Sequence, residues 1–157
     1  MKPTKATTLL ALALTAGVSA FVIANNLATR GFATPLTPIN LSVTLTSIAI
    51  TLVALAIPMI RYRAALKEAK AKPKRVPPFY AIRVVALAKS TAIAGSLFLG
   101  WHVGIFCQQL THPEPNLLPT ILGFVASLLA TAAGVVVEQI FRVPPDATDV
   151  PLEGNPA

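Results

Sequence analysis

Apolar residues occupy four long uninterrupted stretches of this chain, and charged residues are confined to the segments between them. No Asp, Glu, Lys or Arg occurs at positions 6–29, 31–60, 90–113 and 115–137. Each stretch exceeds the ~20 apolar residues with which an α-helix crosses the ~30 Å hydrocarbon core of a bilayer. The pattern therefore predicts an all-α protein, an integral membrane four-helix bundle.

The residues that flank these stretches set the expected boundaries of the helices. The four spans are expected at about 7–27, 41–61, 82–107 and 118–141. The bundle would then occupy residues 1–143, and the Pro-rich, acidic segment 144–157 is predicted to be a disordered tail. The third helix can begin after Pro77-Pro78 and continue to Gln109, which is longer than the hydrocarbon core requires.

The first span admits two interpretations. A basic start, an apolar run and the small-residue pattern Val18-Ser19-Ala20 are also typical of a cleaved signal peptide. The apolar character continues past that point through Phe21, Val22 and Ile23, which favours a retained membrane anchor.

Composition and charge agree with a membrane protein and give it an orientation. Only 12% of residues are charged and the mean hydropathy is +0.68, which excludes an ordinary soluble domain. The net charge is +7, yet residues 61–89 hold nine Lys or Arg against one Glu, so the excess is local. A basic connection between two spans follows the positive-inside rule better than it indicates nucleic-acid binding. We expect a multi-pass plasma-membrane protein with both termini in the cytoplasm (N-in/C-in).

The basic segment between spans two and three is predicted to form a cytoplasmic helical hairpin. Its cations are expected to contact anionic lipid headgroups or the acidic surface of a membrane-protein partner. They are Arg61, Arg63, Lys67, Lys70, Lys72, Lys74, Arg75 and Arg83.

Small residues recur at every fourth position in the later spans, which is typical of closely packed membrane helices. The stripe comprises Ala88, Ala92, Ser96, Gly100 and Gly104 in the third span and Ala126, Ala130 and Gly134 in the fourth. Packing within the chain is favoured over oligomerisation, because four helices must pack together. The first span offers Ala16, Ala20 and Ala24.

Two ionisable residues lie inside the expected spans near the cytoplasmic boundary. Lys89 and Glu138 fall at similar depths, and a carboxylate in hydrocarbon is costly unless it is paired. An interhelical contact between them, with Arg142 as a competing partner, is favoured over a proton- or cation-coupled site.

Chemical motifs of enzymes and cofactor sites are not found in the sequence. His102, Cys107, His112 and Glu114 lack the spacing of a metal site, and one cysteine excludes a disulfide framework. No cofactor and no enzymatic activity are predicted.

Three segments resemble a known family. The start Met1-Lys2-Pro3-Thr4, the run from Ile82 to Ser90 and the close from Glu138 to Pro145 are similar to an uncharacterised actinobacterial family of small four-span membrane proteins, domain of unknown function 3180. The resemblance implies four helices and a plasma-membrane location. It supplies no activity, although members are often encoded beside folate-biosynthesis genes.

Two functions remain open. The first is a non-enzymatic scaffold or accessory subunit whose basic loop contacts anionic lipid or a partner. The second is a small transporter or transporter subunit, linked in some way to folate metabolism, that uses the Lys89 and Glu138 pair.

Overall fold

The structure, a computed structural model, describes residues 4–33, 35–67, 77–111 and 116–141. These residues form four α-helices: α1 (Ala6–Thr29), α2 (Ile39–Lys67), α3 (Pro78–Gln109) and α4 (Leu118–Ile140). The described ranges contain no β-strand. Each helix is long and apolar enough to cross a membrane. The prediction of an all-α chain with four candidate membrane helices is therefore confirmed.

Local sequence explains where the first and third helices begin or end. α3 begins at Pro78, whose missing N–H costs nothing in the first turn of a helix. α1 ends in a Schellman motif, in which Gly31 N–H donates to the Ala28 carbonyl and Phe32 N–H donates to the Leu27 carbonyl, both at 3.0 Å. Gly31 has a φ of 78°, a left-handed conformation that glycine adopts without strain.

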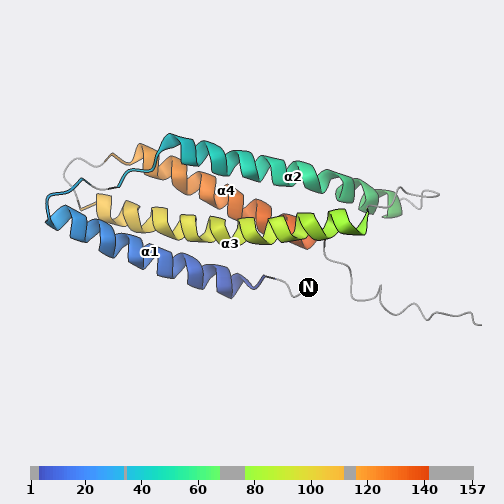
Figure 1. Cartoon of the computed structure of the whole chain (residues 1–157), viewed down its shortest axis with the longest axis horizontal. Helices are drawn as coiled ribbons and strands as arrows, with labels where there is room; N and C mark the ends of the chain where they lie inside the picture. Colours follow the sequence, from blue (N-terminus) through green and yellow to red (C-terminus); the bar gives the residue numbers. More distant parts are fainter. Residues whose placement is uncertain (1–3, 34, 68–76, 112–115, 142–157) are drawn as a thin grey trace, which may run out of the picture.

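The helices form an open arrangement with α3 at its centre. α3 contacts the other three helices and α4 contacts α2 and α3, whereas α1 contacts only α3 among the helices. Figure 1 shows α1 along one side of α3, with α2 and α4 on the other side.

Successive helices run in opposite directions, so the start of α1, the end of α2, the start of α3 and the end of α4 share one end of the molecule. We call this the basic end, because Lys5, Arg61, Arg63 and Arg83 lie there. The other end, at which α1 and α3 finish, is called the opposite end. α2 and α3 extend beyond the start of α1 at the basic end (Figure 1).

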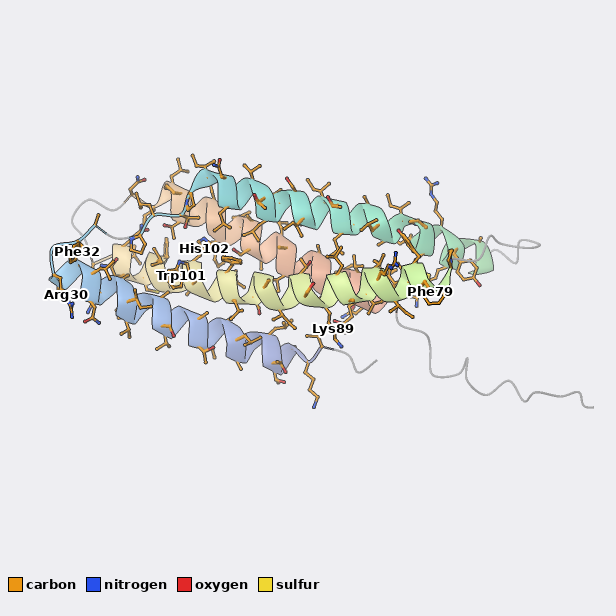
Figure 2. The ribbon with its side chains drawn as sticks, viewed as in Figure 1. Arg30, Phe32, Phe79, Lys89, Trp101 and His102 are labelled. Carbon is orange, nitrogen blue, oxygen red and sulfur yellow. The ribbon has the colours of Figure 1, made fainter. Side chains whose placement is uncertain are left out.

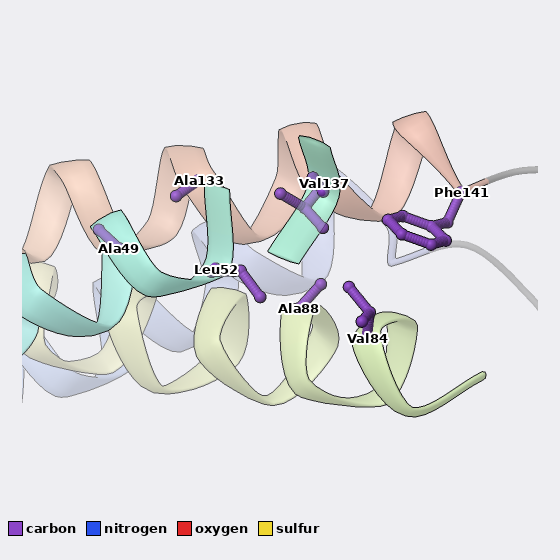
Figure 3. Packing of buried hydrophobic residues seen from close by; sticks show 8 residues of the cluster. Ala49, Leu52, Val84, Ala88, Ala133, Val137 and Phe141 are labelled. Atoms are coloured by element: carbon purple, nitrogen blue, oxygen red, sulfur yellow. The ribbon is translucent and has the colours of Figure 1, made fainter. Parts of the chain in front are cut away.

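Small side chains fill the interior, and large apolar side chains cover the outside. The largest core cluster joins α2, α3 and α4 (Figure 3) and consists of Ala49, Leu52, Ala56, Val84, Ala88, Ala133, Val137 and Phe141. Large residues such as Leu10, Ile50 and Leu118 are more than half exposed. This distribution is typical of helices that pack in lipid, where small residues allow close backbone approach and large residues meet acyl chains.

Several exposed hydroxyl groups on the helices are satisfied within their own helix. Such groups donate to a carbonyl one turn earlier, which removes the cost of facing hydrocarbon with an unpaired donor. Examples are Thr15 to Ala11, Ser19 to Thr15, Thr44 to Asn40, Ser47 to Val43 and Thr51 to Ser47.

Candidate functional site

Glu138, the acid of the expected intramembrane pair, is buried at the basic end of α4. Its carboxylate accepts a hydrogen bond from the backbone N–H of Thr4 at 2.7 Å. Thr4 lies two residues before Ala6, the first residue of α1, so this bond places Glu138 near the beginning of the first helix. The 24 residues of α1 measure about 36 Å at 1.5 Å per residue, enough to cross the hydrocarbon core. Glu138 therefore lies at the boundary of the spans rather than deep between them.

Lys89 lies on α3 at the same end of the molecule and is partly buried. In Figure 2 it lies where α3 passes the start of α1. Arg142, its expected competitor for Glu138, falls outside the described residues. The structure thus adds the Thr4 backbone as a partner of Glu138, and this partner leaves no signature in the sequence.

Cations from three parts of the chain gather at the basic end. Lys5 precedes α1, Arg61 and Arg63 lie near the end of α2, and Arg83 lies in the second turn of α3. The side chains of Lys5, Arg61 and Arg83 are exposed. Lys67 ends α2, and Lys70, Lys72, Lys74 and Arg75 fall outside the described residues.

An aromatic pair accompanies these cations at the start of α3. Phe79 is 80% exposed. The Tyr80 hydroxyl donates a hydrogen bond of 2.7 Å to the Leu55 carbonyl of α2, one turn before Pro58. This bond ties α3 to α2 near the point where proline removes a donor from the helix.

The stripe of small residues on α3 contacts two different helices, α4 and α1. At its basic half, a methyl group added to Gly134 of α4 would lie 2.7 Å from the Ala88 carbonyl oxygen and 2.7 Å from the Ala92 nitrogen. At its other half, methyl groups added to Gly100 and Gly104 would overlap the backbone of α1 at Ala13 and Gly17. The four-residue repeat advances about 40° each time, because four residues at 3.6 per turn exceed one turn. The stripe therefore winds from the α4 side of α3 to the α1 side.

The remaining stripe residues are also buried, but their neighbours differ. Ser96 donates to the Ile93 carbonyl of its own helix at 2.8 Å. Ala126 and Ala130 pack with Leu45 of α2. On α1 the contact face is Ala13, Gly17, Ala20 and Ala24, and Ala16 is only partly buried.

A cluster of buried polar residues lies between α3 and α4 toward the opposite end, and the sequence analysis did not single it out. His102, Ser127 and Thr120 are fully buried, and Gln109 is 2% exposed. The Thr120 hydroxyl donates to the Gln109 side-chain oxygen at 2.9 Å, and Ser127 Oγ lies 3.1 Å from His102 Nδ1. Thr120, Gly123 and Ser127 follow a spacing of three and four on α4, and that polar and small face was the signal available in the sequence.

The space for the histidine ring is created by Gly123. A methyl group at this position would overlap Nε2 of His102 and lie 2.9 Å from Cγ2 of Thr37. Figure 2 shows His102 and Trp101 on α3 toward the opposite end. Within the described ranges, no three His, Cys, Asp or Glu side chains gather where they could hold a metal ion.

An apolar groove of about 470 Å³ runs along the junction of α1 and α3. The groove is almost wholly apolar, and its lining includes Gly17, Gly100, Gly104, Phe21, Cys107 and Phe124.

The chain belongs to a family described as Protein of unknown function (DUF3180), whose model matches residues 9–145. The resemblance identified from the sequence is thereby confirmed. No curated protein matches the chain. No solved structure matches it either.

Proposed function

We propose that this protein is a non-enzymatic scaffold or accessory subunit of the plasma membrane, whose basic end faces the cytoplasm and binds anionic lipid headgroups. The observation that carries the proposal is the gathering of Lys5, Arg61 and Arg83, exposed and drawn from three parts of the chain, at one end of the helices. At the opposite end, Arg30 is the one Lys or Arg within the described ranges. Under the positive-inside rule, this asymmetry supports an orientation with both termini in the cytoplasm.

Electrostatic attraction to an anionic leaflet is strong enough to account for binding at the basic end without a protein partner. A Lys or Arg near an anionic leaflet contributes about 1 kcal/mol, and this attraction decays over a Debye length of about 8 Å at physiological salt. The exposed Phe79 ring lies beside these cations, where an aromatic side chain can anchor in the headgroup region. The same surface could instead take an acidic partner, and the experiment below separates the two.

Two features of the α3–α4 interface favour this proposal over transport through the Lys89 and Glu138 pair. Gly134 packs directly on the backbone of Ala88 and Ala92, which leaves little room for a polar path between Glu138 and the middle of the spans. Glu138 also lies level with Thr4 at the boundary of the first span. A carboxylate there can hold the N-terminal segment through its hydrogen bond to the Thr4 backbone.

The test is native mass spectrometry of the full-length protein taken from bilayers of phosphatidylcholine with and without phosphatidylglycerol. The variants are Arg61→Ala with Arg83→Ala, and a hairpin variant with Ala at Lys70, Lys72, Lys74 and Arg75. Arg30→Ala removes one cation at the opposite end and serves as the control, with lipid retention compared per cation removed. We expect retention of phosphatidylglycerol to fall about fivefold for each contacting cation removed, since ~1 kcal/mol corresponds to that factor.

Each outcome bears on the proposal. Equal phosphatidylglycerol retention in all variants would reject the lipid contact. A protein that copurifies stoichiometrically and is lost with the hairpin variant would replace lipid by a partner at the same surface. Uptake or proton movement in reconstituted vesicles that disappears with Glu138→Gln would favour the transport alternative.

A further inference from the structure

The buried polar cluster between α3 and α4 holds one group whose chemistry can be fixed from its contacts. His102 Nδ1 lies 2.6 Å from the Phe98 carbonyl oxygen. A carbonyl oxygen cannot donate a hydrogen bond, so the proton of this pair must be on Nδ1. The Ser127 hydroxyl donates to the Gly123 carbonyl at 2.6 Å, which leaves its oxygen to accept from Nδ1–H at 3.1 Å.

This assignment makes Nε2 the acceptor of the neutral ring. Its lone pair is buried in a side chain that is 0% exposed, and it has no hydrogen-bond partner among the described residues. Leaving such an atom unpaired costs about 1–3 kcal/mol. An apolar side chain at position 102 would avoid this loss of stability. The presence of a histidine with an unpaired Nε2 therefore requires an explanation.

A further unpartnered polar atom belongs to the same region of the interface. Within the described ranges, Gln109 Nε2 is buried and also lacks a hydrogen-bond partner, and the side chain of Gln109 is joined to α4 by the hydrogen bond from Thr120. Gln109 is the last residue of α3, and His102 lies seven residues earlier, about 10 Å along the helix. Thr37, which precedes α2, lies against the same Gly123 surface as Nε2. These groups form a polar lining that begins at the opposite end and reaches inward.

Space and charge limit what this lining can bind. Gly123 and Thr37 lie close to Nε2, so the ligand must be small. Among the described residues around the ring, α4 contributes Gly123 and Ser127 and the segment before α2 contributes Thr37, and none of them is charged. A metal ion would need several further ligands, and an uncompensated cation would be costly in this surrounding. A small neutral hydrogen-bond donor satisfies both limits.

We propose that the α3–α4 interface contains a hydrated binding site, in which Nε2 of His102 accepts a hydrogen bond from water admitted at the opposite end. Buried waters typically make about three hydrogen bonds to polar groups that would otherwise lack partners. The close contact of Gly134 with Ala88 and Ala92 closes the interface on the other side of Ser127. Water at this site would therefore be exchanged from the opposite end alone.

The test is solid-state NMR of the full-length protein in lipid bilayers with ¹⁵N-labelled histidine and glycine. The chain has two histidines, so a His112→Asn variant leaves His102 as the single imidazole, and the unsubstituted chain repeats the measurement in case that variant folds poorly. We expect a protonated Nδ1 and an unprotonated Nε2 that accepts a hydrogen bond. Magnetisation from water protons should reach the His102 ring several-fold faster than it reaches the Gly134 amide. Gly134 serves as the reference because it lies in the close contact between α3 and α4.

Three results would overturn the proposal. Transfer from water to His102 as slow as to Gly134 would show a dry site. A proton on Nε2 with Nδ1 unprotonated would contradict the assigned tautomer. A ring protonated on both nitrogens at neutral pH would remove the acceptor altogether.

Discussion

At the residue scale, the size of single side chains decides how closely the helices approach. Gly100 is the clearest case, because its backbone meets the Ala13 carbonyl of α1 with no room for a methyl group. The sequence shows that small residues recur every four positions. It does not show that one stripe serves two neighbours, since this depends on how the repeat winds around α3.

We predict that Gly100→Ala destabilises the α1–α3 contact and that Gly17→Ala does so far less. The added methyl overlaps the Ala13 backbone in the first variant, whereas in the second it would lie 3.1 Å from the Gly100 carbonyl oxygen. Overpacking of this kind costs about 1–3 kcal/mol. Both variants gain the same helix propensity, so their difference in thermal unfolding midpoint in mild detergent isolates the contact. Equal midpoints would contradict the close approach.

A second residue-scale prediction concerns the bond between α3 and α2. Tyr80→Phe removes the hydroxyl that donates to the Leu55 carbonyl and is expected to lower the free energy of unfolding by about 0.5–1.5 kcal/mol. Tyr62→Phe is the control, because that hydroxyl makes no hydrogen bond within the described ranges. Denaturation monitored by circular dichroism measures both. A Tyr80 variant as stable as the Tyr62 variant would show that the bond contributes nothing.

At the scale of elements, the four helices could be predicted and their neighbours could not. The uninterrupted apolar stretches are sufficient to predict that the four helices exist. The Pro77-Pro78 pair predicted the start of α3 correctly. The end of α1 was expected near residue 27, and the helix continues to Thr29, where the left-handed Gly31 ends it. The partner of each helix depends on side-chain fit in space. The polar cluster around His102 was missed for that reason, since its members come together from positions 37 to 127.

The same contacts predict that α1 remains part of the mature protein. Cleavage after Ala20 would remove Ala13 and Gly17 and expose Gly100 and Gly104 to lipid. It would also remove Thr4, the hydrogen-bond donor to Glu138. The intact mass of protein purified from membranes should therefore match the 16.4 kDa chain. A mass lower by the first twenty residues would identify a signal peptide and leave α3 without its α1 neighbour.

At the scale of the whole molecule, alternating helix directions bring distant cations to one end. The sequence predicts this end through the positive-inside rule, because residues 61–89 hold nine Lys or Arg against one Glu, more than the whole net charge of +7. The structure adds that α2 and α3 extend beyond the start of α1 there (Figure 1). In the proposed orientation this extension would bring Arg61 and Arg83 toward the headgroup region, which is the physical basis of the proposed lipid contact.

The measurement that tests this account most directly is the side of the membrane on which each end lies. In a Cys107→Ala background, which removes the single cysteine of the chain, one cysteine is introduced at Ala33 or at Ala71. A membrane-impermeant maleimide should label Ala33→Cys in intact cells and label Ala71→Cys only after lysis. Labelling of Ala71→Cys in intact cells, with Ala33→Cys protected, would place the basic end outside and contradict the account.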